Sequence, residues 1–275
     1  MLRAAMSANL VIAAAAVSVV ASTALLADRP VPMGASVAAF TSAFAVYNFD
    51  RLADKTVNDG SSSPQRAALL RRFRAAVVAA VWVACLVMFG VAISAGFVGA
   101  LWVLAFPLGG LLYVVPLFAG KRLKDIPYLK SLYVPVCWCT FVGQAASLGS
   151  IEFGAELAVF TAFFFLRAFA SAAVGDIRDV EADRAAGVQT LIVALGRDRG
   201  AHLIAAVHAA SISVLVVAAS LSLVPAGTTA LAIPAMFGYA CFCRIAARPE
   251  RSEFSHDLYD FEVVAYAPML WLMLP

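Results

Sequence analysis

The sequence has little charge. Of its 275 residues, 13% are Asp, Glu, Lys or Arg and 63% are hydrophobic, whereas a soluble domain usually has about a quarter charged and about half apolar residues. This composition excludes an ordinary soluble protein. A net charge of +3 is too small to indicate nucleic-acid binding, which requires a strongly basic face. We therefore expect a polytopic membrane protein that binds no nucleic acid.

Cysteine and histidine are also scarce, with five and three residues. The cysteines lie in apolar runs, and two pairs have the spacing CxC, at 137 and 139 and at 241 and 243. Residues i and i+2 lie about 200° apart on a helix, so neither pair converges on a metal. The histidines have no metal-binding spacing with Cys or acids. We interpret the cysteines as small buried hydrophobes.

Long apolar segments dominate the chain. A helix needs about 20 apolar residues to cross a hydrocarbon core roughly 30 Å thick. The first segment is too long for the core of a secretory signal, and the last is the weakest because Asp260 and Glu262 form what we interpret as a solvated helix start. Since the loops are short, we expect one domain over residues 1–275, an all-α polytopic membrane helical bundle. Its nine predicted transmembrane segments are 7–27, 32–50, 75–94, 97–118, 131–149, 154–175, 201–222, 227–246 and 259–275.

The basic residues predict how the bundle is oriented. Arg29 is the single Lys or Arg assigned to one side, and the others, with Arg167 counted among those of the sixth loop, fall at the opposite ends of the segments. The positive-inside rule then places the N-terminus and the even-numbered loops in the cytoplasm, at the inner membrane if the protein is bacterial. Most acids share this side, so we expect a central cavity that opens at the cytoplasmic side.

Three carboxylates stand out in the stretch DIRDVEADRAAGVQTL, residues 176–191. Asp176, Asp179 and Asp183 fall at about 0°, 300° and 340° around a helix and share one face, whereas Glu181, at about 140°, points elsewhere. Three carboxylates this close repel each other unless a cation or several basic groups lie between them. The spacing therefore predicts a metal site.

A second acidic face follows the second apolar segment, in VYNFDRLADKTVND, residues 46–59. Asp50 and Asp54 lie about 40° apart on a helix. Two acidic clusters at the cytoplasmic ends of two segments would close over one cavity. Mg²⁺ suits such a site because it binds one or two carboxylates together with substrate phosphate oxygens and water. We therefore expect a diphosphate substrate.

These motifs resemble the UbiA superfamily of intramembrane prenyltransferases, whose nine-helix bundle carries NDxxDxxxD after the second helix and DxxDxxxD after the sixth. The second motif is matched in full, and GVQTLIVALG at 187–196 is similar to the family's Gly-x-x-Thr-Leu-Pro, with Ile192 at the proline position. The stretch YVVPLFAGKRLKDIPYLK at 113–130 is similar to the family's Tyr and Pro followed by a Lys-rich run. The resemblance covers essentially the whole chain.

The first motif departs from the family pattern. Val46 and Tyr47 stand where the family has Asn and Asp, and Asn48 lies about 160° from Asp50 in a continuous helix. Either the helix breaks so that Asn48 turns inward, or Asn48 serves loop structure and Tyr47 faces the cavity.

The resemblance implies a Mg²⁺-dependent transferase, embedded in membrane lipid, that moves an isoprenyl group from an allylic prenyl diphosphate to a lipophilic acceptor, expected to be aromatic, and releases diphosphate. It assigns catalysis and Mg²⁺ binding to Asp50, Asp54, Asp176, Asp179 and Asp183. Candidates for binding the diphosphate are Asn48, Arg51, Lys121, Arg122, Lys124 and Lys130. Candidates for lining the prenyl or acceptor cavity are Tyr47, Tyr113 and Tyr133, with Trp138 and Phe163, Phe164 and Phe165 as further aromatics.

Two other functions are open. A membrane terpene cyclase of the same superfamily would capture the allylic cation internally and need no acceptor. A transporter or a non-catalytic lipid-binding protein is less favoured, because transporters carry their intramembrane charges at mid-depth, whereas here the acids cluster at helix ends.

Overall fold

The computed structural model describes residues 9–53, 72–115, 123, 126–185, 187–247 and 258–274, without the side chains of residues 178, 179 and 182. Within these ranges every regular element is helical, so the all-α prediction is confirmed for the described residues. The elements are α2 (Leu10–Leu26), α3 (Met33–Ala53), α6 (Arg74–Ser94), α7 (Gly96–Val114), α8 (Leu129–Leu148), α9 (Ala155–Ala185), α10 (Leu191–Leu195), α11 (Arg197–Ser220), the 3-10 helix η2 (Ala226–Leu231), α12 (Ala232–Ala247), α14 (Phe261–Val264) and α15 (Tyr266–Met273).

Each of the predicted membrane segments overlaps one of these helices or helix pairs. Among the described residues, six helical segments are long and apolar enough to cross a membrane: Arg74–Ser94, Gly96–Val114, Leu129–Leu148, Ala155–Ile177, Arg197–Ser220 and Ala226–Ala247. The other three predicted segments correspond to α2, to α3 and to the pair α14 and α15. Of these, α2 and the segment Phe261–Met273 are apolar but shorter.

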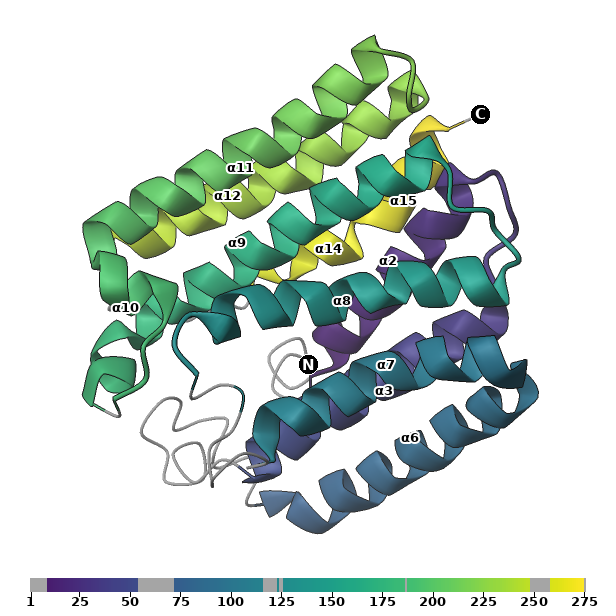
Figure 1. The fold of residues 1–275 in the computed structure, drawn as a ribbon, viewed down its shortest axis with the longest axis horizontal. Coiled ribbons are helices and arrows are strands. Elements are labelled where there is room, and N and C mark those ends of the chain that lie inside the picture. The colour runs from purple at the N-terminus through teal and green to yellow at the C-terminus, as the bar shows by residue number, and fades with distance from the viewer. Residues whose placement is uncertain are drawn as a thin grey trace.

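The long helices lie side by side (Figure 1). Helices α2, α8 and α9 lie between α3, α6 and α7 on one side and α11 and α12 on the other. One apolar core is shared by α2, α3, α8, α9 and α15, and it includes Phe141, Phe160 and Leu270. A second core joins α9 to α10, α11 and α12 and includes Ile192 and Phe242.

Small residues allow α3, α7 and α8 to approach closely. A Cβ at Gly110 of α7 would lie 2.5 Å from Val46 Cγ1 of α3, and a Cβ at Gly143 of α8 would overlap the ring of Trp102. Both glycines are therefore required by their neighbours. Small residues of this kind are typical of helix interfaces inside membranes, where close backbone approach provides the packing energy.

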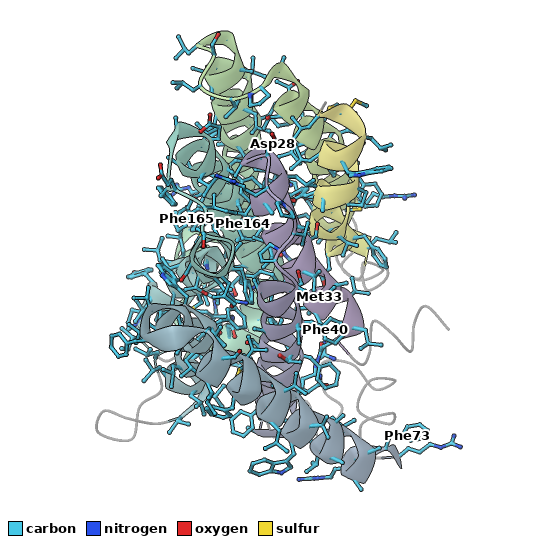
Figure 2. All side chains as sticks on the ribbon, turned by 90° about the vertical axis from the view of Figure 1, so that its right-hand side faces the viewer. Asp28, Met33, Phe40, Phe73, Phe164 and Phe165 are labelled. Carbon is cyan, nitrogen blue, oxygen red and sulfur yellow. The ribbon has the colours of Figure 1, made fainter. Side chains whose placement is uncertain are left out.

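The outward faces are apolar, as a lipid-facing surface requires. On α6 the exposed fraction is 67% for Trp82, 69% for Leu86 and 84% for Ile93. Figure 2 shows side chains covering the outer faces of the helices, with Phe73 at the end of α6. Exposed apolar patches of this extent are not stable in water, so the described surface agrees with a membrane environment.

Helix α9 is longer than the segment predicted to cross the membrane. It has 31 residues, about 46 Å at 1.5 Å per residue, against a hydrocarbon core of roughly 30 Å. The prediction ended this segment at residue 175, but the helix continues to Ala185. The acidic motif is therefore displayed on the extended end of a rigid helix rather than in a loop.

Candidate active site

Helices α8 and α9 bring two of the predicted aspartates together around one lysine. Lys130 Nζ lies 2.7 Å from Asp176 Oδ1 and 3.4 Å from Asp183 Oδ2. Ser131 Oγ donates to Asp176 Oδ2 at 3.3 Å. Asp176 and Asp183 therefore share a face of α9, as their seven-residue spacing predicts. We call Lys130, Asp176 and Asp183 the acid–lysine cluster.

This cluster is partly shielded from solvent. The side chain of Asp176 is 2% exposed, that of Asp183 is 17% exposed and that of Lys130 is 23% exposed. A buried carboxylate needs a counter-charge or hydrogen-bond donors to offset its lost hydration. Lys130 and Ser131 supply both to Asp176.

Local backbone geometry fixes the start of α8 beside the end of α9. Gly187, at φ +72°, ends α9 in the left-handed conformation that favours glycine at this position, and Val188 N donates to Asp183 O at 2.8 Å. Tyr128 N, in the residue before α8, donates to Gln189 O at 2.9 Å. Lys130 is therefore held close to the acidic face of α9.

The cluster fits a divalent cation. Two carboxylates from one helix already direct oxygens at a single positive charge, the Lys130 ammonium, and carboxylate oxygens are the protein ligands that Mg²⁺ prefers. Among the described side chains, no group of three or more His, Cys, Asp or Glu is close enough to hold a metal ion. The CxC pair of α12 does not converge, since Cys241 is buried and Cys243 is exposed.

Several predicted site residues lie outside the described part of the chain. Asp54 and the basic residues Lys121, Arg122 and Lys124 are among them, and for Asp179 the structure describes the backbone alone. Their predicted roles stay predictions.

Helix α3 is continuous through the altered first motif, from Met33 to Ala53, and includes Asp50 and Arg51 in its last turn. Asn48 is buried, and its Nδ2 donates to Phe44 O at 2.8 Å. The hydroxyl of Tyr47 accepts a hydrogen bond from Trp138 Nε1 at 2.9 Å. The helix therefore does not break, so the first interpretation of this motif is wrong. Tyr47 turns to the interior, as the second interpretation predicts, but Asn48 bonds within α3 and does not serve a loop.

The other two predicted tyrosines lie between α7 and α8. The rings of Tyr113 and Tyr133 are stacked, with centroids 6.2 Å apart and an interplanar angle of 6°. Tyr133 OH donates to Gly109 O at 2.9 Å, so this hydroxyl ties the two helices together. Both tyrosines are half-buried.

Two polar features are absent from the sequence-based prediction. Ser131 follows Lys130 directly, and a hydroxyl in the first turn of an apolar helix is the signal that could have revealed it. The second is a buried ion pair between Arg167 of α9 and Glu262 of α14, with Nη2 to Oε2 at 2.5 Å. Glu262 was interpreted as a solvated helix start, but it is 1% exposed, because Arg167 neutralises it inside the bundle.

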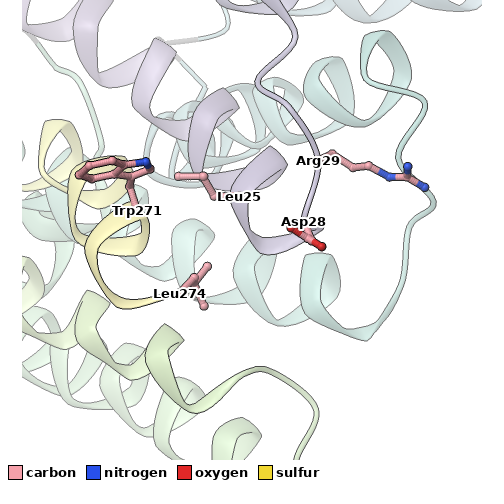
Figure 3. A pocket seen from close by; sticks show the side chains of 5 residues that line it. All are labelled: Leu25, Asp28, Arg29, Trp271 and Leu274. Carbon is pink, nitrogen blue, oxygen red and sulfur yellow. The ribbon is translucent and has the colours of Figure 1, made fainter.

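Figure 3 shows a pocket that none of the acid–lysine cluster residues lines. It has a volume of about 300 Å³ and is lined by Leu25, Asp28, Arg29, Trp271 and Leu274. Asp28 and Arg29 precede α3, whereas Asp50 is in its last turn. None of the predicted site residues lines this pocket.

The fold is shared with solved membrane proteins. A UbiA homolog from Aeropyrum pernix K1, solved in its apo form, superimposes with a TM-score of 0.71 at 15% identity, over 96% of this chain and 98% of that chain. A UbiA homolog from Archaeoglobus fulgidus, bound to GPP and Mg²⁺, has a TM-score of 0.61 at 13% identity, over 98% of this chain and 99% of that chain. A digeranylgeranylglyceryl phosphate synthase has a TM-score of 0.59 at 11% identity, over 99% of this chain and 97% of that chain. These likenesses define the fold class as a UbiA-type helical bundle.

The family follows from the sequence. The model of the UbiA prenyltransferase family matches residues 10–257, which is most of the chain, so the protein belongs to this family. A comparison with curated proteins gives no match. Six apolar helices and the family together indicate an integral membrane protein.

Proposed function

We propose that the protein is a Mg²⁺-dependent prenyltransferase that moves an isoprenyl group from an allylic prenyl diphosphate to a lipophilic, aromatic acceptor. The observation that carries the proposal is the convergence of Asp176 and Asp183 on one positive charge at the end of the bundle. The Archaeoglobus fulgidus relative, which has the same fold, binds GPP and Mg²⁺. This supports a prenyl diphosphate and Mg²⁺ as ligands of this chain.

The proposal includes the arrangement in the membrane. Residues 1–275 form one domain that crosses the membrane nine times, which is the inner membrane if the protein is bacterial, with the N-terminus and both acidic motifs in the cytoplasm and the cavity opening there. The apolar outer faces and the overlap of each predicted segment with a helix support it. The even-numbered loops carry most of the basic residues, which supports the orientation.

The residues of the cluster have separate roles in the proposed reaction. Asp176 and Asp183, with Asp179, Asp50 and Asp54 as the further predicted ligands, hold Mg²⁺ together with the diphosphate oxygens. Mg²⁺, when bound, neutralises the diphosphate and makes it a better leaving group. Among the predicted diphosphate-binding side chains, Asn48, Arg51, Lys121, Arg122, Lys124 and Lys130, the position of Lys130 between two aspartates favours a direct charge contact with the diphosphate.

The aromatic side chains below the cluster suit the carbocation. When the bond between the allylic carbon and the diphosphate oxygen breaks, the diphosphate leaves with the electron pair and the prenyl group carries the positive charge. The ring faces of Tyr47, Tyr113 and Tyr133 stabilise such a charge, and the apolar walls exclude water. The acceptor supplies the electron pair of the new bond and loses a proton.

The test uses purified protein with a labelled prenyl diphosphate and Mg²⁺, with and without aromatic acceptors, and measures diphosphate release. We expect release from the wild type, and a loss of about 100-fold or more in Asp176→Asn and Asp183→Asn. Glu181→Gln is the matched control, because Glu181 lies on the exposed side of α9, 77% exposed and paired with Arg184. If both aspartate variants release diphosphate like the control, the assignment is wrong. If diphosphate is released without an acceptor and the prenyl product is cyclic, the protein is the cyclase instead.

A further inference from the structure

Interior aromatic rings from four helices meet below the acid–lysine cluster. Trp138 of α8 lies at their centre, with ring centroids 6.2 Å from Tyr47 of α3, 5.8 Å from Phe106 of α7, 5.5 Å from Phe141 of α8 and 6.3 Å from Phe164 of α9. We call these five residues the aromatic layer. The layer thus joins α3, α7, α8 and α9 in the interior of the bundle.

A hydrogen bond holds the central ring of this layer in place. Trp138 Nε1 donates to Tyr47 OH at 2.9 Å, and edge-to-face contacts with Phe106, Phe141 and Phe164 surround the indole. An indole N–H needs a partner when it is inside an apolar interior. Turning Trp138 aside would therefore break that bond and the surrounding ring packing.

The rings packed against Trp138 are buried. Tyr47 and Trp138 are half-buried, whereas Phe141 is 0% exposed and Phe164 is 1% exposed, and Phe160, also 0% exposed, stacks on Phe164. The interior beyond Trp138 is therefore filled by packed rings. Beside it α7 packs closely on α3 and α8, since Val46 and Trp102 fill the space where side chains at Gly110 and Gly143 would be.

The depth between cluster and layer is short. Trp138 follows Lys130 by eight residues and Ser131 by seven on the same helix, which is about 11–12 Å along the axis, and the seven-residue spacing places Trp138 below Ser131 on one face. An extended chain advances about 1.2 Å per bond. An isoprene unit, with four carbons in its main chain, thus spans about 5 Å, and two units reach Trp138.

We propose that Trp138, held by Tyr47, is the specificity-determining residue that limits the donor to allylic diphosphates of about ten carbons or fewer. This inference rests on the proposed prenyl transfer and adds the donor class. A third isoprene unit would collide with the indole. The competing possibility, that a longer chain leaves sideways between helices, is an outcome of the test.

Binding of unreactive donor analogues tests the inference without knowledge of the acceptor. Purified protein with Mg²⁺ is titrated with thiolodiphosphate analogues of dimethylallyl, geranyl, farnesyl and geranylgeranyl chains, and Kd is measured. We expect the geranyl analogue to bind about ten-fold or more tightly than the farnesyl analogue. Trp138→Ala should improve farnesyl binding by about ten-fold and leave geranyl binding within about three-fold. Tyr47→Phe keeps the ring but removes the hydrogen-bond acceptor. Its Kd for the farnesyl analogue should lie between those of the wild type and Trp138→Ala.

Controls separate the possible failures. Trp82→Ala removes a tryptophan from the outer face of α6, where it is 67% exposed, and should keep the wild-type preference. Trp138→Leu serves as a second variant where Trp138→Ala does not fold, with geranyl binding as the measure of an intact site. Equal wild-type binding of the four analogues, or an unchanged preference in both Trp138 variants, overturns the inference. If none of the analogues binds with or without Mg²⁺, the proposed function itself is wrong.

Discussion

Removing one partner of the buried ion pair between Arg167 and Glu262 is expected to destabilise the bundle strongly. Arg167 is 2% exposed and Glu262 is 1% exposed. Glu262 Oε1 accepts from Arg167 Nε at 2.6 Å, and Tyr266 OH donates to the same oxygen. Arg167 also donates to His208 Nδ1 at 2.5 Å and to Ala235 O at 3.3 Å. The pair thus joins α9 to α11, α12 and the α14–α15 segment.

The magnitude follows from what each substitution leaves behind. Glu262→Gln leaves the guanidinium buried without its counter-charge, which costs about 3–5 kcal/mol. For a chain of this size we expect the midpoint of thermal unfolding to fall by about 10 °C. Replacing both partners, with Arg167→Met and Glu262→Leu together, removes both charges and should recover more than half of this loss.

Thermal unfolding of the purified protein in detergent, followed by tryptophan fluorescence, measures the effect. Glu181→Gln is the matched control, since the pair of Glu181 and Arg184 lies on the same helix α9 but is 77% and 54% exposed. Exposed pairs contribute little to stability, so this variant should unfold near the wild-type temperature. A midpoint for Glu262→Gln equal to that of Glu181→Gln would refute the reasoning, as would a double variant that is less stable than either single one.

Two further substitutions test the packing and the cluster. Gly238→Ala places a Cβ over the carboxylate of Glu262 and 3.0 Å from the guanidinium of Arg167. It should lower the midpoint of thermal unfolding by several degrees. Gly90→Ala is the control and should leave the midpoint unchanged, because nothing lies within 4 Å of the new Cβ. Lys130→Met leaves Asp176 buried beside Asp183 without a counter-charge. It should cost about 3 kcal/mol without metal, and added Mg²⁺ should restore part of this. A midpoint that Mg²⁺ does not raise contradicts the cation site.

Local periodicity allowed the sequence to predict that Asp176 and Asp183 share one face of the candidate site. The spacing of Asp176 and Asp183 fixes their common face wherever α9 packs, because a helix turns by about 100° per residue. The apolar segments likewise identify the helices, since the membrane requires a minimum length. The sequence did not predict which basic residue meets the acids, because the contact between Lys130 and Asp183 spans 53 positions.

The buried ion pair was not predicted either, because its two residues are also far apart in the sequence. Arg167 and Glu262 are 95 positions apart, and each alone resembles an ordinary charge near a membrane boundary. Arg167 precedes Asp176 by nine residues, which places the two side chains about 180° apart around α9. One helix therefore carries two polar faces, one toward Lys130 and one toward Glu262. The repeating pattern of a single helix does not reveal which neighbour covers the second face.

The altered first motif and the aromatic layer have one physical explanation. Where the family pattern has two polar residues, Val46 fills the space over Gly110 and Tyr47 binds Trp138. A polar pair at these positions would remove the packing between α3 and α7 and the acceptor that holds the indole. The last turn of α3 thus carries Asp50, a predicted metal ligand, and the preceding turn packs against α7 and α8. This packing is what the proposed limit on donor length requires, because a chain longer than that limit would have to continue into the space that Trp138 and its neighbours fill.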